Sequence, residues 1–286
     1  MKRYDMKRTV ALALLLGLAM GLLLPSLVIE VDNKMVLGNG PGGGGGGGGK
    51  PEPPASEIVY YMDSPEDKWA VIIGITDYDG QSSDLMNPHN DALEMKDILE
   101  AYGYNYALAL DGAATSDNFD VLMDWLIVNE GPDSEVVFFF SGHGARTQDG
   151  SWDSDTETDG YDECIVSWDL YAITDAYMTS KFAELESNRF AAIYCSCHSG
   201  GMFDQTYEVR SGGLYIAAAE ADQYGWDYGE LQNTLFFYYF GDQGLLNGPY
   251  DNAQDAFWYA RPLVINEQPD SCPIMLDNIG TPFYVK

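Results

Sequence analysis

The chain contains few basic residues, few histidines and few cysteines. Its 286 residues include 14 Lys or Arg against 45 Asp or Glu, three His and four Cys, and the formal net charge at pH 7 is −31. So few cations exclude the positive surface that nucleic-acid binding needs, and we expect no nucleic-acid partner. Four cysteines exclude a disulfide-dense scaffold. The chain also lacks a G-x-S-x-G nucleophile turn, a P-loop, and a dinucleotide fingerprint between a strand and a helix.

The amino-terminal part is not a globular sequence. Basic residues lie within residues 1–8, and an uncharged apolar segment follows at 9–29. That segment is long enough to cross a bilayer core, which takes about 20 apolar residues. It predicts a signal-anchor or a signal peptide. Because basic flanks stay on the cytoplasmic side, we expect a cytoplasmic tail at 1–8 and an extracytoplasmic, membrane-anchored remainder, or a secreted one if the segment is cleaved.

A linker at 30–56 comes next. It holds unbroken glycines at 42–49 and several prolines, a composition that buries no core and behaves as a flexible spacer. Residues 57–286 are then enough for one domain with its own core.

Strand and helix patterns alternate along this domain. Apolar runs predict strands at 69–75, 104–110, 136–140, 164–168, 190–194 and 213–219, and helical spacing predicts helices at 90–103, 116–128, 175–185 and 234–240. Such alternation is typical of an α/β fold. We expect a three-layer sandwich with a mostly parallel sheet flanked by helices.

Two motifs follow two of these strands directly. Ser-Gly-His-Gly occupies 141–144, and Cys-Ser-Cys-His-Ser-Gly occupies 195–200. The carboxyl ends of parallel strands form the ligand crevice of open α/β folds, and adjacent strands lie about 4.8 Å apart. An imidazole and a thiol at neighbouring strand ends are therefore close enough for His143 to serve Cys197 as a nucleophile.

These motifs resemble those of caspase-fold (clan CD) cysteine peptidases. The likeness is greatest to metacaspases and prokaryotic caspase-like proteins, with legumain-like peptidases second. It rests on residues 139–145, on Asp-Gly-Tyr-Asp-Glu at 159–163 and on Cys-His-Ser-Gly at 197–200.

The resemblance implies a cysteine endopeptidase that acts on polypeptides and can process itself. Cys197 would attack the scissile carbonyl, and His143 would protonate the leaving amine. The backbone N–H groups of Gly144 and Cys197 would form the oxyanion hole. The chemistry would need no cofactor.

One position departs from the metacaspase pattern. Metacaspases usually carry Asp two residues before the nucleophile, at the floor of a pocket for Arg or Lys, and this chain has Cys195 there. A neutral thiol cannot pair with a guanidinium. Glu220 and Asp222, which follow the strand at 213–219, are the candidates to supply acidity from the opposite wall.

The loop at 153–163 is rich in carboxylates and matches the first half of a calcium loop, although position twelve is Val166 rather than Glu. Metacaspases are often calcium-activated. The candidate Ca²⁺ ligands are Asp155, Asp159, Asp162, Asp175 and Asp204.

Three other interpretations remain open. Cys195, Cys197, His198 and His143 have the ligand types of a zinc site. The domain could be a catalytically inactive, membrane-tethered caspase-like binding domain. If the compartment is oxidising, Cys164 and Cys272 are the natural disulfide pair.

Overall fold

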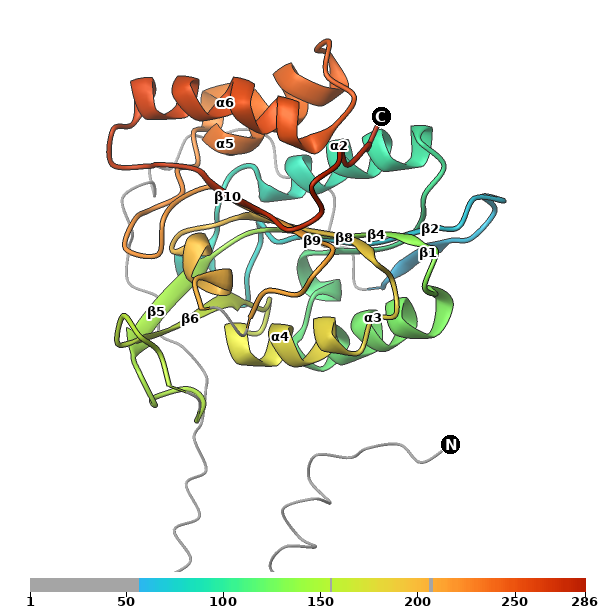
Figure 1. Ribbon diagram of the computed structural model, residues 1–286. Helices are drawn as coiled ribbons and strands as arrows, with labels where there is room; N and C mark the ends of the chain where they lie inside the picture. Colours follow the sequence, from blue (N-terminus) through green and yellow to red (C-terminus); the bar gives the residue numbers. More distant parts are fainter. Residues whose placement is uncertain (1–56, 155, 206–207) are drawn as a thin grey trace, which may run out of the picture. The chain divides into compact units, whose positions relative to one another are not determined.

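The structure is a computed structural model that describes residues 57–286 except 155, 206 and 207 (Figure 1). The tail, apolar segment and linker expected at 1–56 lie outside the described residues. No helix in the part of the chain that the structure describes is long and apolar enough to cross a bilayer.

A seven-stranded sheet is the middle layer of the domain. Its order is β1-β3-β2-β4-β8-β9-β10. The strands from β3 to β9 in this order pair in parallel, whereas the edge strands β1 and β10 are antiparallel to their neighbours. The bounds are β1 (Val59–Tyr61), β2 (Lys68–Gly74), β3 (Asn105–Leu110), β4 (Glu135–Ser141), β8 (Arg189–Cys195), β9 (Gly213–Ala217) and β10 (Ile274–Asp277).

Helices cover both faces of this sheet (Figure 1). On one face lie α2 (Pro88–Ala101), α5 (Leu235–Phe237), the π-helix η5 (Tyr238–Leu246) and α6 (Ala253–Glu267). On the other lie α3 (Ser116–Asn129) and α4 (Asp175–Ala183). The predicted three-layer α/β sandwich with a mostly parallel sheet is confirmed.

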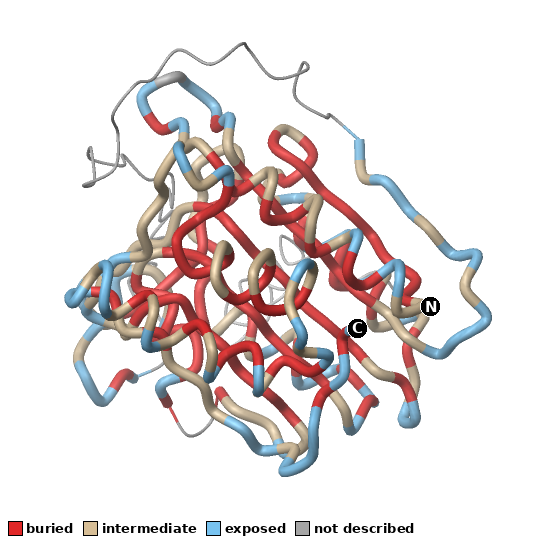
Figure 2. The backbone as a smooth tube through the Cα atoms, turned by 90° about the horizontal axis from the view of Figure 1, so that it is seen from above, coloured by how far each residue is buried: buried red, intermediate tan, exposed pale blue. Residues whose placement is uncertain are grey.

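The central strands are apolar at almost every position because both of their faces are buried. In β2, Ala70 and Ile72 pack into the core under α2, while Val71 and Ile73 pack into the core under α3. Successive strand residues point to opposite faces, so a strand covered on both sides needs an unbroken apolar run. Figure 2 shows these strands as buried segments through the middle of the domain.

Local signals fix where two helices begin. Thr115 and Thr174 are the N-caps of α3 and α4, and each side chain accepts a hydrogen bond from the backbone N–H three residues later. Both helices start within a residue of the predicted positions. The short 3-10 helices are η1 (Gln81–Ser83), η2 (Asp111–Ala113), η3 (Ser199–Phe203) and η4 (Gly229–Leu231).

A second, antiparallel sheet projects beside the first one. It consists of β5 (Gly144–Gln148), β6 (Tyr161–Val166) and β7 (Ala172–Thr174). The sequence predicted a strand only near β6, because β5 is polar and β7 has three residues. The acidic loop connects β5 to β6.

The carboxyl-terminal part holds elements that the sequence analysis did not predict. The helix expected at 234–240 is three residues of α5 followed by the π-helix η5. After it come α6, which contains Pro262, and the edge strand β10.

No disulfide links any of the four cysteines, all of which lie in the part of the chain that the structure describes. Cys164 is buried in the core under α3, and Cys272 lies just before β10. The expected Cys164–Cys272 disulfide is therefore not formed in this structure.

Candidate active site

The register of the sheet brings the two motifs to one edge. β4 and β8 pair in parallel with Ser141 opposite Cys195, which are their last residues. His143 and Cys197 each lie two residues beyond this pair. Both side chains line one pocket of about 410 Å³, a volume that includes its opening to solvent. The sequence-predicted dyad residues are thus neighbours.

His143 is held in a defined orientation. Its Nε2 lies 2.8 Å from the carbonyl oxygen of Ser83. Since a carbonyl only accepts, Nε2 carries the proton and Nδ1 is the nitrogen left to accept one. Burial lowers the pKa of His143, so the ring is neutral near pH 7.

Tyr78 supports His143 from the loop after β2. Its hydroxyl accepts a 2.7 Å hydrogen bond from the backbone N–H of His143, and the two ring centroids lie 4.8 Å apart. The hydroxyl also lies 3.4 Å from the carbonyl oxygen of Val166, to which it donates. Neither Tyr78 nor Ser83 was predicted, because nothing in their sequence surroundings marks them.

The surroundings of the Cys197 thiol favour its protonated form. Its Sγ donates to the carbonyl oxygen of Gly225 at 3.5 Å. Burial raises the pKa of the thiol to about 11. Each member of the dyad is therefore engaged by a backbone carbonyl, His143 by Ser83 and Cys197 by Gly225.

Only glycine fits at position 144. A Cβ there would lie 2.0 Å from the carbonyl oxygen of Cys197 and 2.8 Å from Oγ of Ser196. The start of β5 thus passes directly against the turn that holds Cys197, which brings together the two residues predicted for the oxyanion hole.

The turn after Cys197 has an unusual backbone. His198 has a φ of 54°, in the left-handed region. Its backbone N–H donates a 2.9 Å hydrogen bond to the carbonyl oxygen of Gln223, and its Nδ1 lies 2.8 Å from the carbonyl oxygen of Ala221. These hydrogen bonds connect the turn to the loop after β9.

The residues predicted for substrate binding lie in different places. Cys195 is buried and lines the pocket. Glu220 and Asp222 are outside the pocket lining, and Asp222 is exposed. The carboxylates nearer to the pocket are Asp227 in its wall and the buried Asp91, which interacts with the Cys195 thiol. Neither was singled out from the sequence.

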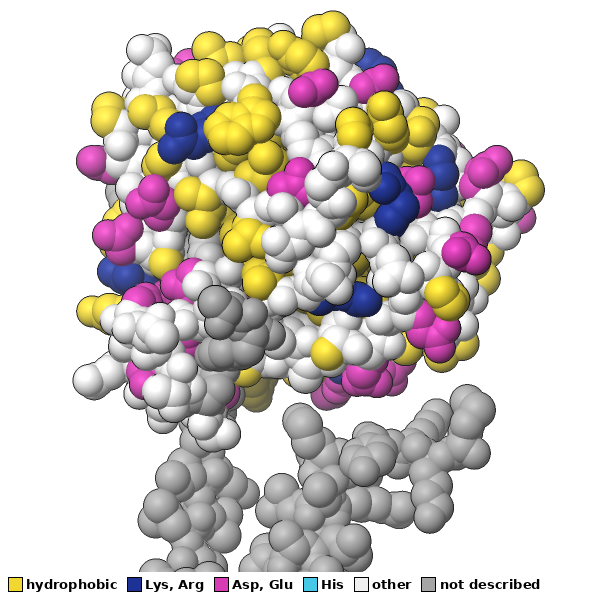
Figure 3. Space-filling model, in the orientation of Figure 1, with side chains coloured by type: hydrophobic (Ala, Val, Ile, Leu, Met, Phe, Trp, Pro, Cys, Tyr) yellow, Lys and Arg dark blue, Asp and Glu magenta, His cyan; other side chains and the backbone are white. Residues whose placement is uncertain are grey.

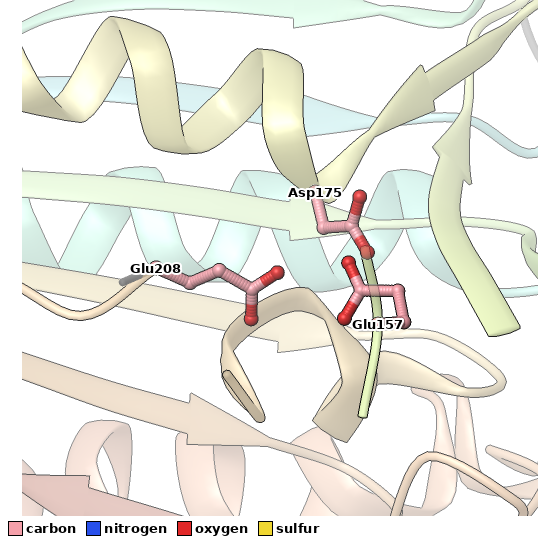
Figure 4. A group of neighbouring side chains, drawn as sticks. All are labelled: Glu157, Asp175 and Glu208. Atoms are coloured by element: carbon pink, nitrogen blue, oxygen red, sulfur yellow. The ribbon is translucent and has the colours of Figure 1, made fainter. Parts of the chain in front are cut away.

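Carboxylates also gather beside β6. Glu157, Asp175 and Glu208 offer oxygens within 4.8 Å of one another and are all buried (Figure 4). Asp159, Glu163 and Asp204 form a second such group. Among the described residues, both candidate cation groups consist of carboxylates alone, so neither contains the thiols and imidazoles of the zinc alternative.

Burial and like charge raise the pKa values in these groups. Burial is the first cause for Glu163 and Glu208, whose pKa values rise to about 9, and for Asp175, whose pKa rises to about 8. Both side-chain oxygens of Glu163 and Oε1 of Glu208 are buried without a hydrogen-bond partner among the described residues. Hard oxygen ligands in this arrangement fit a divalent cation such as Ca²⁺.

The five predicted metal ligands are thus divided. Asp159, Asp175 and Asp204 belong to the two groups. Asp162 does not, because its oxygens accept hydrogen bonds from the backbone N–H groups of residues 150–152 and hold the turn after β5. Asp155 lies outside the described residues. The sequence analysis did not select Glu157, Glu163 or Glu208.

Comparison with known proteins shows which proteins this chain is similar to. The family model "Caspase domain" matches residues 67–263. The chain is 32% identical over 166 residues to metacaspase-1 of Candida albicans, covering 51% of this chain and 36% of the relative. It is 35% identical over 162 residues to metacaspase-1 of Cryptococcus neoformans, covering 51% and 35%. The chain thus spans little more than a third of the length of these curated relatives.

Two solved structures share the fold. A Geobacter sulfurreducens protein matches with a TM-score of 0.57 at 17% identity, covering 74% of this chain and 93% of that one. The Drosophila initiator caspase Dronc matches with a TM-score of 0.54 at 12% identity, covering 79% and 86%. The family model covers more than half of the chain and includes both strand-end motifs. The chain therefore belongs to the caspase-domain family and is similar in sequence to metacaspases.

Proposed function

We propose that this chain is a cysteine endopeptidase with Cys197 as nucleophile and His143 as acid–base. The observation that carries the proposal is the pocket that both side chains line, at the carboxyl ends of two paired strands. Membership of the caspase-domain family supports it. The presence of both dyad residues argues against the inactive binding domain.

The geometry suggests the route of the proton. Nδ1 of His143 takes the thiol proton, and Sγ of Cys197 bonds to the scissile carbonyl carbon. The carbonyl electrons move onto oxygen, which the N–H groups of Gly144 and Cys197 stabilise. The imidazolium then protonates the leaving amine and a thioester remains. Water, deprotonated by His143, hydrolyses the thioester and restores the thiol.

The substrate must compete with Gly225 for the thiol. Because the carbonyl of Gly225 accepts from Sγ, attack requires this contact to break. Buried thiols are poor nucleophiles until a base takes the proton, so thiolate formation would accompany substrate binding.

We also propose that Ca²⁺ stimulates this activity by binding the carboxylates beside β6. The carboxylate groups include residues on segments that adjoin His143 and Cys197. A Cβ on Gly201, in the helix after the nucleophile turn, would lie 2.3 Å from Cγ of Glu163. Asp204 ends the same helix, and the N–H of Val166 in β6 donates to the carbonyl oxygen of His143 at 3.0 Å. A cation that ordered these side chains would therefore support both halves of the dyad.

The membrane proposal rests on the sequence alone. We propose that segment 9–29 holds the domain outside the membrane, since its basic flank belongs on the cytoplasmic side. Protease added to intact cells should release a soluble fragment by cutting the linker at 42–54. A full-length protein found free in the cytosol would contradict this.

The catalytic proposal is tested with the full chain in detergent. Hydrolysis of a fluorogenic peptide library should be abolished in Cys197→Ala and in His143→Ala, and a thiol alkylator should label Cys197. Cys195→Ser should retain substantial turnover on the peptides that it accepts. Comparing the chain masses of the wild type and Cys197→Ala after storage tests self-processing. Loss of activity in Cys195→Ser with full activity in Cys197→Ala would overturn the assignment.

A further inference from the structure

The pocket that borders the dyad has mostly uncharged walls. Leu85, Cys195, Ala218, Trp226 and Phe236 contribute to them. Among the described residues that line the pocket, Asp227 is the only carboxylate. The nucleophile attacks the carbonyl of the residue on the amino side of the scissile bond, so a pocket directly beside Sγ is positioned for that residue's side chain.

The carboxylate of Asp227 already has partners. Its Oδ2 accepts a 2.6 Å hydrogen bond from the backbone N–H of Met86, and its Oδ1 accepts one of 2.8 Å from Nδ2 of Asn87. These bonds hold the loop after β9 to the residues that precede α2. Asp227 thus serves to join two loops.

The second nearby carboxyl, that of Asp91, is not among the residues that line the pocket. It is fully buried and accepts hydrogen bonds from the Ser141 hydroxyl at 2.7 Å and from the N–H and hydroxyl of Thr234 at 3.0 and 2.7 Å. Burial raises its pKa to about 7, so it carries at most a partial charge near neutral pH. The Cys195 thiol, buried beside it, adds no charge, since burial raises the pKa of that thiol as well.

The polar groups of the pocket that have no partner include an obligatory donor. The indole Nε1 of Trp226 and the Oγ of Ser196 are buried without a hydrogen-bond partner among the described residues. Both residues line the pocket. An indole N–H can only donate. A guanidinium or an ammonium also only donates, so it leaves the indole N–H unsatisfied, and the one carboxylate in the wall is already held by two donors of the protein.

We infer that this pocket selects an uncharged side chain, rather than Lys or Arg, on the amino side of the scissile bond. The inference rests on the proposed peptidase function and names its substrate class. Cys195 is the specificity-determining residue, because it lines the pocket and its thiol interacts with the engaged carboxyl of Asp91.

The test is a library of fluorogenic peptides that differ only in this residue, hydrolysed by the full chain in detergent. We expect kcat/KM for Gln, Met or Leu at least tenfold above that for Arg and Lys. Cys195→Asp should shift the ratio toward Arg and Lys by at least tenfold. Cys195→Ser, a neutral variant of similar size, should keep the wild-type preference.

The outcomes separate the inference from the function it rests on. A wild-type preference for Arg or Lys, retained in Cys195→Ser, would overturn the inference and leave the peptidase assignment intact. A preference for Asp or Glu would overturn it equally. Failure to cleave any peptide, with Cys197 not labelled by a peptidyl thiol-reactive probe, would overturn the peptidase function itself. The melting temperature of Cys195→Asp shows whether this variant folds. If it does not fold, the substrate preference of the wild type still tests the inference.

Discussion

The hydroxyl of Tyr78 and the backbone N–H of His143 form a 2.7 Å hydrogen bond that fixes the segment carrying the imidazole. Tyr78 is buried and its ring contacts that imidazole. A side chain at Gly142 would lie 2.6 Å from the Tyr78 hydroxyl, so the chain turns closely around this oxygen. The loop after β2 therefore determines where the imidazole of His143 lies.

Tyr78→Phe should weaken both stability and turnover. The substitution leaves the N–H of His143 without its acceptor, which costs about 1–3 kcal/mol for a buried donor. Urea denaturation and kcat for a peptide substrate measure the two effects. Tyr177→Phe is the matched control, since the Tyr177 hydroxyl donates to Asp120 at the surface. Equal loss of turnover in both variants would show that Tyr78 has no specific effect on His143.

Gly144→Ala should reduce kcat by about 100-fold to 1000-fold, the loss typical when an oxyanion donor is displaced. The reason is the 2.0 Å approach of a Cβ to the carbonyl oxygen of Cys197. Gly131→Ala is the control, because a Cβ there meets nothing within 4 Å. Retention of wild-type kcat in Gly144→Ala would show that this close approach is unnecessary for turnover.

Alkylation of Cys197 in the substrate-free protein should be slow at pH 7 and accelerate by about tenfold per pH unit, because only the thiolate reacts. Burial raises the pKa of this thiol to about 11, so the folded state holds the proton more tightly than the unfolded state. That contribution to stability is present below the unfolded pKa and is lost as pH rises toward 11. Iodoacetamide labelling mapped by mass spectrometry measures the rate. A rate that is independent of pH between 6 and 8 would indicate a preformed thiolate–imidazolium pair.

The carboxylates beside β6 should make the calcium-free protein less stable as pH rises. The pKa values of Glu163 and Glu208 rise to about 9, so between their ordinary values and 9 the folded state binds more protons than the unfolded state. The slope of unfolding free energy with pH is then negative over this window. Millimolar Ca²⁺ should flatten that slope, because it replaces the protons and binds the folded form.

Melting temperatures from pH 5 to 9, in EDTA and in Ca²⁺ at equal ionic strength, test this expectation. Glu208→Gln should reduce the calcium response, and Asp133→Asn, which removes an exposed acid elsewhere, should not. Figure 3 shows acidic side chains spread over the face in view, so general screening is the competing explanation. If sodium at the same ionic strength reproduces the whole effect, the cation proposal fails.

Some features could not be predicted because their sequence signals are weak. β5 is polar and short, so it has no apolar run, and the edge strand β10 has four residues. The mostly apolar run that includes residues 234–246 has helical character, but nothing in it separates α5 from the π-helix that follows. Ser83 acts through its backbone carbonyl, which every residue type has.

The sequence by itself determined the sheet's central strands, the helices between them and the edge at which His143 and Cys197 lie. Periodicity and strand-end turns are properties of single segments, so they can be read along the chain. Tertiary structure alone decided which carboxylates meet. Glu157, Asp175 and Glu208 come from a loop, a helix start and a second loop, and their proximity depends on how those segments pack. The same holds for Asp91, which reaches Ser141 at the end of β4 because α2 packs against the sheet.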